Sequence, residues 1–267
     1  MRVIVTRPER EAKRWVGDLS ALGIEAVALP LIKVGPVADT TEIVHAWQHL
    51  SDYAAVMFVS GNAAGYFFAS KPPLIPDFSA QKQIKTRAWA TGPATAKALL
   101  RAGVAADRID APAPDAGQFD SEALWQLVGA KVQSSQRVLI VRGVDSGRNA
   151  EVRHGTGREW LAQRIAEAGA TAEFVVAYQR SAPEFSAADH ELALQAAGDG
   201  SVWLFSSTEA VANLCVRLPE QSWSQARALA THWRIAAAAR QAGFVVVYES
   251  SPTLTGVATL LADKFCP

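Results

Sequence analysis

A pattern of strand, helix and strand occurs twice in this chain, once at its beginning and once from residue 137 to residue 180. The first copy has apolar runs at residues 3–5 and 27–29, and the second has them at residues 138–141 and 174–178. Matching positions are roughly 135 to 146 residues apart, and a repeat of long period indicates a duplicated structural unit. The sequence therefore predicts a fold with an internal duplication.

The segments that follow each copy also correspond. Residues 57–60 (Met-Phe-Val-Ser) match residues 203–206 (Trp-Leu-Phe-Ser), and residues 89–91 match residues 229–231. Short, continuous apolar runs are typical of strands that are covered on both faces of a parallel sheet. Because such runs alternate with helix patterns along the chain, the sequence predicts an α/β fold with doubly wound parallel sheets.

The length of 267 residues suits two domains of ordinary size better than one very large sheet. In each copy an extended segment follows the first strand-helix unit. It is interrupted by Pro30 in the first copy, and residues 180–183 flank it in the second. Because Pro30 cannot donate to a strand ladder, its segment is predicted to be an edge strand or a link between domains.

If both extended segments cross between domains, the first unit of each copy joins the sheet of the other copy. Residues 3–6 then lie in one sheet with residues 202–205, and not beside residues 57–59. The predicted domains are residues 1–34 with 179–267, and residues 35–178, with linkers near 27–36 and 173–182.

The charge balance and the few cysteines exclude several classes of protein. Basic and acidic residues number 26 each, so no net field attracts nucleic acid or an anionic membrane. No apolar run approaches the roughly 20 residues that span a bilayer, and the N-terminus shows no export signal. Cys215 and Cys266 are too few for a disulfide framework or a zinc site, and the histidines have no metal-ligand or triad spacing. We therefore expect a monomeric, cytoplasmic protein that binds no metal, nucleic acid or membrane.

Six short motifs occur at predicted strand ends, and together they carry a family resemblance. They are Val-Thr-Arg-Pro at 5–8, Phe-Val-Ser-Gly-Asn-Ala at 58–63, Gly-Pro-Ala-Thr-Ala at 92–96, Val-Arg-Gly at 141–143 with Gly-Arg-Glu-Trp-Leu at 157–161, Tyr-Gln-Arg at 178–180, and Phe-Ser-Ser at 205–207. In this order and spacing, over essentially the whole chain, the sequence resembles the uroporphyrinogen-III synthase family.

The resemblance implies two flavodoxin-like domains, joined by a pair of extended linkers, with the active site in the cleft between them. It implies that no cofactor and no metal is used. The implied reaction closes the linear tetrapyrrole hydroxymethylbilane to uroporphyrinogen III, with loss of water and inversion of ring D. Hydroxymethylbilane synthase is the implied partner for a transient hand-over of this substrate.

The implied chemistry makes modest demands on side chains. The substrate is intrinsically reactive and cyclises without an enzyme to the wrong isomer, so the protein must chiefly hold one folded conformation. Loss of the hydroxyl from ring A still needs a proton donor. A tyrosine in an apolar strand is usually a core residue, but the resemblance makes Tyr178 a candidate general acid.

The implied substrate also carries eight carboxylates. Backbone N–H groups at helix N-termini, together with hydroxyl and arginine side chains at strand ends, are suited to bind them. Such groups meet at one edge of a parallel sheet, where ligands usually bind. The candidate substrate-binding residues are Arg7, Ser60, Asn62, Thr91, Thr95, Arg142, Ser206, Ser207, Thr231 and Arg234.

Several of these candidates also have a purely structural interpretation. Ser60 and Ser206 are typical helix N-caps, and Ser206 with Glu209 forms a predicted capping box. Thr95 can be an ordinary helix residue, and Arg7 and Arg142 can pin loops to carbonyl groups or carboxylates. The pattern alone leaves both interpretations open.

Two segments depart from what the resemblance predicts. Thr231-His232-Trp233-Arg234 stands where a Gly-x-x-Thr turn like that of the first copy is expected, which makes His232 and Arg234 alternative carboxylate partners. The loop at residues 145–157 has no counterpart in the first copy. Its residues Arg148 and Arg153 indicate either a solvated surface loop or a segment that pairs with substrate carboxylates.

Two other functions fit the same architecture. A non-catalytic, two-lobed protein could bind a polyanionic small molecule, although the missing export signal disfavours a periplasmic one. An enzyme acting on sugar phosphates could use the repeated helix N-termini, although a dedicated glycine-rich phosphate loop is absent. Turnover of hydroxymethylbilane, with the product isomers resolved, separates all three hypotheses.

Overall fold

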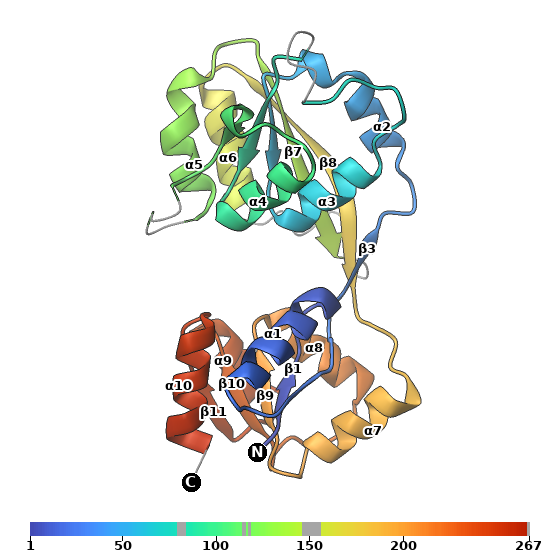
Figure 1. Cartoon of the computed structure of the whole chain (residues 1–267), viewed down its shortest axis with the longest axis vertical. Coiled ribbons are helices and arrows are strands. Elements are labelled where there is room, and N and C mark those ends of the chain that lie inside the picture. The colour runs from blue at the N-terminus through green and yellow to red at the C-terminus, as the bar shows by residue number, and fades with distance from the viewer. Residues whose placement is uncertain (79–83, 114–115, 117–118, 146–155, 266–267) are drawn as a thin grey trace. The chain divides into compact units, whose positions relative to one another are not determined.

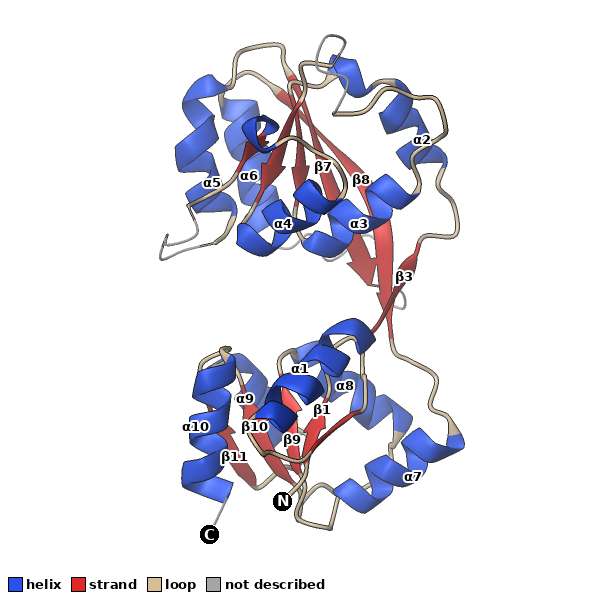
Figure 2. Ribbon diagram, viewed as in Figure 1, coloured by secondary structure: helices blue, strands red, loops and turns tan. Residues whose placement is uncertain are grey.

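The computed structural model describes residues 1–78, 84–113, 116, 119–145 and 156–265, with the backbone alone at 156–158. Contacts divide the chain into two compact units (Figure 1). Unit one contains Met1–Val34 and Ser181–Pro267, and unit two contains Gly35–Arg180. Each unit is built around one sheet flanked by helices (Figure 2).

Unit one has a five-stranded sheet in the order β11-β10-β9-β1-β2, and all its neighbouring strands are parallel. The strands are β1 (Val3–Val5), β2 (Ala26–Ala28), β9 (Val202–Phe205), β10 (Arg227–Ala230) and β11 (Val246–Glu249). In chain order this is the 2-1-3-4-5 arrangement of flavodoxin-like folds. Val3 pairs with Val202 and Val5 with Leu204, which confirms that the first strand lies beside residues 202–205.

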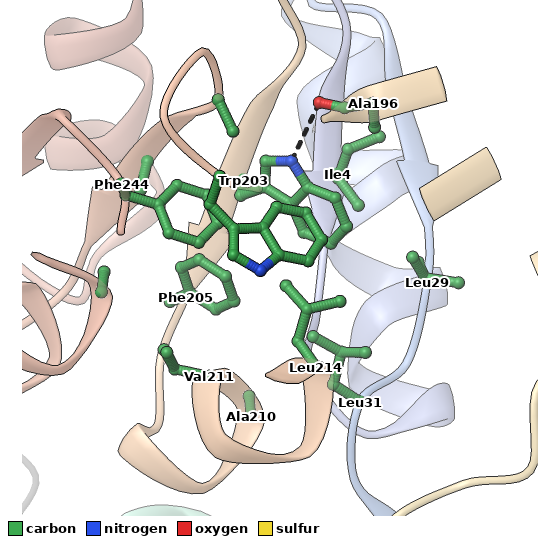
Figure 3. Close-up of a cluster of buried hydrophobic side chains, with 14 of the residues drawn as sticks. Ile4, Leu29, Leu31, Ala196, Trp203, Phe205, Ala210, Val211, Leu214 and Phe244 are labelled. Atoms are coloured by element: carbon green, nitrogen blue, oxygen red, sulfur yellow. Dashed lines mark hydrogen bonds between the residues drawn. The ribbon is translucent and has the colours of Figure 1, made fainter. Parts of the chain in front are cut away.

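Helices cover both faces of this sheet. Helices α1 (Glu9–Ala21) and α10 (Leu254–Phe265) pack on one face, while α7 (Ala187–Ala196), α8 (Thr208–Arg217) and α9 (Trp233–Gln241) pack on the other. Successive strand residues point to opposite faces. Val3 and Val5 therefore pack in a first cluster with α1 and α10, and Ile4 packs in a second cluster with α7, α8 and α9. Trp203 lies in the second cluster and donates its indole N–H to the carbonyl oxygen of Ala196 at 3.0 Å (Figure 3).

Unit two has a six-stranded sheet in the order β3-β8-β7-β4-β5-β6. The strands are β3 (Lys33–Pro36), β4 (Ala55–Phe58), β5 (Arg87–Ala90), β6 (Ile109–Asp110), β7 (Arg137–Asp145) and β8 (Thr171–Ser181). Strands β7 and β8 come from the second copy of the repeat, yet β7 pairs with β4 of the first half. The swap of strand-helix units is therefore confirmed. In chain order the five strands from β8 to β6 run 5-4-1-2-3, a circular permutation of the order in unit one, while the duplication itself stays a prediction.

The helices of unit two form two layers. They are α2 (Thr41–Gln48), α3 (Gly61–Ala69), α4 (Pro93–Arg101), α5 (Ser121–Val128) and α6 (Thr156–Glu167), with 3-10 turns η1 (Leu50–Asp52), η2 (Ala106–Arg108) and η3 (Gly129–Lys131). Helices α5 and α6 bury Leu124 and Leu161 against one face of the sheet. On the opposite face, aromatic rings of α2 and α3 pack together, with Trp47 stacked on Phe67 at a centroid distance of 4.6 Å.

Residues 29–32 connect β2 of unit one to β3 of unit two. Pro30 lies in this connection, outside any strand, as expected for a residue without a backbone N–H to donate. No helix among the described residues is long and apolar enough to cross a membrane.

Candidate active site

Most of the predicted site residues follow the carboxyl ends of strands, or lie on the helix turns that follow them. In unit one, Arg7 follows β1, Ser206 and Ser207 follow β9, and Thr231 follows β10. In unit two, Ser60 follows β4 and Thr91 follows β5. Parallel strands bring such residues to one edge, and ligands of this fold class bind where the strand order reverses. That point lies between β1 and β9 in unit one and between β7 and β4 in unit two.

Tyr178 and Ser60 meet at the carboxyl edge of unit two. Tyr178 is only 5% exposed, and its hydroxyl oxygen lies 3.3 Å from Ser60 Oγ. Ser60 is the N-cap of α3 and accepts a hydrogen bond from the backbone N–H of Ala63 at 3.1 Å. The capping role predicted for Ser60 is therefore confirmed, and the same oxygen also contacts the candidate acid.

Either of the two hydroxyls can donate this hydrogen bond. A serine hydroxyl has one hydrogen to donate and lone pairs to accept with. While Ser60 accepts from Ala63, it can donate its own hydrogen to the phenol oxygen of Tyr178. In that arrangement the phenol keeps its hydrogen for a further acceptor. The pair is thus suited to deliver a proton.

Two further residues contact the ring of Tyr178, and neither was among the predicted site residues. Gly143 on β7 lies beneath it, since Gly143 is paired with Tyr178 across a register shift between the two strands. Tyr66 of α3 stacks against it with ring centroids 6.0 Å apart and planes at 22°. The sequence could have identified Tyr66 as a neighbour of the site, because Tyr66 lies on the helix that Ser60 caps.

The other candidates of unit two occupy the same edge but have different surroundings. Thr91 donates its hydroxyl to the carbonyl oxygen of Val59 at 3.4 Å. Thr95 is buried in the first turn of α4, whereas Asn62 is exposed in the first turn of α3. The guanidinium carbon of Arg142 lies 5.0 Å from the ring centroid of Phe174, a cation–π contact within the sheet.

In unit one, the cap of α8 differs from the prediction. Ser207, not Ser206, is the N-cap, and its hydroxyl accepts from the N–H of Glu209 at 3.1 Å. The helix begins at Thr208, so Glu209 is the second helical residue and cannot complete a capping box with Ser206. The Ser206–Glu209 capping box is therefore wrong, and Ser206 lies half-buried between β9 and the cap.

Arg7 is held against the helix that follows it. Its guanidinium carbon lies 4.3 Å from the ring centroid of Trp15, and Nη1 lies 3.4 Å from Oε2 of Glu11. Burial lowers the pKa of the Arg7 guanidinium, against the opposing effect of Glu11. These contacts match the loop-pinning interpretation, and a contact of Arg7 with substrate stays a prediction.

The His232 segment shows how the chain replaces the expected turn. Thr231 is 8% exposed and donates its N–H to the carbonyl oxygen of Phe205 at 3.1 Å. His232 is the N-cap of α9, and its Nδ1 accepts from the N–H of Arg234 at 3.2 Å. Since Nδ1 accepts, this contact assigns the ring proton to Nε2. Trp233 is 60% exposed, and the Arg234 guanidinium carbon lies 5.3 Å from its ring centroid.

Two further features bear on the site. Within the described part of the chain, no group of three or more His, Cys, Asp or Glu side chains could hold a metal ion. Strand β7 ends at Asp145 and α6 begins at Thr156. The predicted loop at 145–157, with Arg148 and Arg153, therefore falls largely outside the described residues.

A cavity of about 400 Å³ lies at the amino edge of unit two, at the opposite ends of the strands from Ser60. Its lining includes Tyr53, Arg87, Asp110 and Lys131. Arg87 and Lys131 both pair with Asp110, so these charges are satisfied within the protein. The carboxyl edge is where parallel sheets bind ligands, and we therefore place the candidate active site there.

The comparisons with known proteins point to one family. The family model described as uroporphyrinogen-III synthase HemD matches residues 13–258. A uroporphyrinogen-III synthase of Chlorobaculum parvum is 28% identical over 183 residues, which cover 68% of this chain and 64% of that protein. One of Synechococcus elongatus is 24% identical over 213 residues, which cover 80% of this chain and 73% of that protein. The match to the Chlorobaculum protein thus spans slightly less than two thirds of its length.

Solved structures show the same fold. A mutant uroporphyrinogen III synthase of Thermus thermophilus superposes with a TM-score of 0.51 at 17% identity, covering 97% of this chain and 96% of that one. A uroporphyrinogen-III synthetase of Helicobacter pylori superposes with a TM-score of 0.55 at 17% identity, covering 98% of both chains. The predicted two-domain α/β architecture is therefore confirmed.

Proposed function

The chain belongs to the uroporphyrinogen-III synthase family, and we propose that it converts hydroxymethylbilane to uroporphyrinogen III with loss of water and inversion of ring D. The observation that carries the proposal is the family match over residues 13–258. The contact between Tyr178 and Ser60 supports it, because two hydroxyl groups meet at the sheet edge where ligands of this fold class bind.

We assign the proton transfer to Tyr178. As the hydroxyl of ring A leaves, the phenol gives its proton to that oxygen, and the pyrrole nitrogen supplies the electron push. Ser60, 3.3 Å away, donates to the phenol oxygen and stabilises the negative charge that develops there. General acid catalysis of this kind contributes about a hundred- to ten-thousandfold. Tyr178 is nearly buried, so water competes little with the leaving hydroxyl.

The remaining task is to hold the substrate in one folded conformation. The cation formed by loss of water is reactive enough to be attacked by ring D without further activation. Fixing the two reacting carbons near each other can supply roughly 7 to 11 kcal/mol of the barrier. Selection of the type III isomer over spontaneous closure therefore depends on binding groups more than on additional acids or bases.

Carboxylates on the substrate fit the edge groups of both units. In unit two we assign them to Arg142, Asn62, Thr91 and Thr95, with the N-terminal N–H groups of α3 and α4. In unit one we assign them to the N-terminal turns of α8 and α9 and to the side chains near them. Those side chains are Arg7, Ser206, Ser207, Thr231 and Arg234. The expected cleft between the two domains stays a prediction.

The family also suggests a partner enzyme, an oligomeric state and a cellular location. The family's substrate is the product of hydroxymethylbilane synthase, and because it cyclises spontaneously a direct hand-over would protect it. We propose a transient contact with that enzyme, a monomeric state and a cytoplasmic location.

The experiment that tests the function is turnover of freshly prepared hydroxymethylbilane, with the product isomers resolved by chromatography. Spontaneous closure gives the type I isomer, so a reaction without protein is the baseline. We expect the protein to convert the substrate to the type III isomer, and we expect the Tyr178→Phe variant to move the product back toward type I. Binding of hydroxymethylbilane without type III product would favour the non-catalytic binding protein, and the absence of both would end the proposal.

A further inference from the structure

The glycine at position 143 is not explained by its backbone. Its φ lies outside the positive range that favours glycine, in contrast to Gly169 with a φ of 78°. It lies in β7, where a side chain ordinarily stabilises a strand. The conformation would therefore accept any residue, and something in the surroundings must require the missing side chain.

The ring of Tyr178 occupies that space. A Cβ atom added to Gly143 would lie within 2.7 Å of three ring carbons, Cζ, Cε1 and Cε2. Carbon atoms pack at about 3.5 to 4.0 Å, so the ring as placed excludes even alanine. The contact involves the end of the ring that carries the hydroxyl.

The sheet order explains why the ring crosses this strand. Strand β7 lies between β8, which carries Tyr178, and β4, which leads to Ser60. Neighbouring strands are about 4.8 Å apart, so a side chain on β8 must pass over β7 to reach Ser60. Gly143 provides a gap in β7 at the point of crossing.

A β-bulge aims the ring at this gap. Arg142 pairs with Val176, but the next residue, Gly143, pairs with Tyr178, so Ala177 is the extra residue on β8. Bulges re-aim side chains next to functional sites.

We infer that Gly143 is a positioning residue for the Tyr178 hydroxyl. The gap at Gly143 and the bulge at Ala177 place the phenol against Ser60, while Tyr66 limits its motion from the side of α3. The effect of Gly143 on the reaction rests on the proposed function of Tyr178. Its effect on the position of the phenol does not.

The test compares Gly143→Ala with Gly35→Ala. Gly35 lies in β3 of the same sheet, and a Cβ there would meet no atom within 4 Å, so its substitution controls for the loss of a strand glycine. We expect Gly143→Ala to lower kcat by roughly ten- to a hundredfold, the cost of a misplaced reacting group, with little change in KM. Gly35→Ala should leave both constants within about twofold.

Combining Gly143→Ala with Tyr178→Phe separates an effect on the position of the hydroxyl from an effect on the stability of the fold. The phenyl ring still occupies the gap, so Gly143→Ala should lower the melting temperature in that background too. Its effect on kcat should vanish there, because the hydroxyl that it misplaces is already absent. A further loss of kcat of the full size in the Tyr178→Phe background would overturn the inference.

A spectroscopic measurement makes the inference independent of turnover. The chain has four tyrosines, so labelling with 3-fluorotyrosine gives a small set of fluorine resonances, and the signal missing in Tyr178→Phe identifies Tyr178. We expect Gly143→Ala to shift this resonance and Gly35→Ala to leave it in place. A shift without any turnover of hydroxymethylbilane would retain Gly143 as a positioning residue and reject the proposed function. An unmoved resonance would reject the inference.

One further variant keeps the test decisive if Gly143→Ala does not fold. Combining it with Tyr178→Ala removes the ring from the gap, so the double variant should fold as well as Tyr178→Ala alone. Failure of the double variant to fold, with Tyr178→Ala folded, would show that Gly143 is needed for another reason and would overturn the inference.

Discussion

Ser60 and Tyr178 are 118 residues apart in sequence, yet their hydroxyl oxygens lie 3.3 Å apart at the carboxyl edge of one sheet. The same serine oxygen accepts the N–H of Ala63 at the start of α3. A residue that stabilises a helix thus also holds the candidate acid, so its contributions to stability and to catalysis need to be measured separately.

Substitution of Tyr178 by phenylalanine removes one hydroxyl and leaves the ring over Gly143. We expect the rate of type III formation to fall by about ten- to a thousandfold, as for loss of an acid or an oriented donor. The circular dichroism spectrum should not change. The measurement is the initial rate with the isomers resolved, and a rate equal to that of the unmodified protein would return Tyr178 to a purely structural role.

Substitution of Ser60 by alanine should reduce both stability and rate. Loss of the N-cap costs about 1 kcal/mol of unfolding free energy, measurable by denaturant titration. Loss of the hydrogen bond to the developing phenolate should lower kcat by about tenfold or more. In the Tyr178→Phe background the effect on kcat should disappear and the effect on stability should remain.

Asp120→Ala is the matched control for Ser60→Ala. Asp120 caps α5 through the N–H groups of Glu122 and Ala123, and α5 packs on the face of the sheet opposite α3. It should cost a similar amount of stability without changing kcat. Equal kcat losses in the two cap variants would mean that Ser60 acts on the rate only through the stability of the fold.

The two adjacent serines after β9 should respond differently to alanine. Ser207→Ala removes the cap of α8 and should lower the unfolding free energy by about 1 kcal/mol. Ser206→Ala removes no cap and should leave stability within about 0.5 kcal/mol. If Ser206 binds a substrate carboxylate, its variant should instead raise KM, and an unchanged KM in Ser206→Ala would remove it from the binding residues.

Asp110 should contribute to stability in a pH-dependent way. Burial alone would raise its pKa, but hydrogen bonds and charge from Arg87, reinforced by Lys131, outweigh this and hold the pKa of the carboxyl below its ordinary value of 3.8. A carboxyl with a depressed folded pKa stabilises the protein above its unfolded pKa and loses that contribution as the pH falls below it.

The corresponding variant is Asp110→Asn. At neutral pH it should be less stable than the unmodified protein, because Arg87 and Lys131 lose their shared partner. The difference should shrink as the pH falls from 3.8 through the lower pKa of the folded carboxyl, as measured by denaturant titration at each pH. Asp263→Asn, at an exposed position of α10, is the control. A stability difference that stays constant over this pH range would contradict the assignment.

Local patterns in the sequence predicted most of the elements, whereas the swapped strand pairing was predicted from the repeat and its two extended segments. Apolar runs such as Val202–Phe205 can be recognised as strands in the sequence, because a strand covered on both faces needs continuous apolar residues. Ser60 was predicted as a cap because capping depends on residues within one helical turn. Ser206 was predicted in place of Ser207 because two adjacent serines fit the same pattern, and only the point where α8 begins decides between them.

The sequence by itself determined which residues form strands and which follow them, and the repeat with its two extended segments predicted that Ser60, Thr91 and Tyr178 belong to one sheet. Only the tertiary structure decided that Tyr178 lies over Gly143 and reaches Ser60. That contact depends on the register between β7 and β8, where one extra residue, Ala177, re-aims the side chains that follow. Register is set by packing between segments distant in sequence, so no pattern within a single strand contains it.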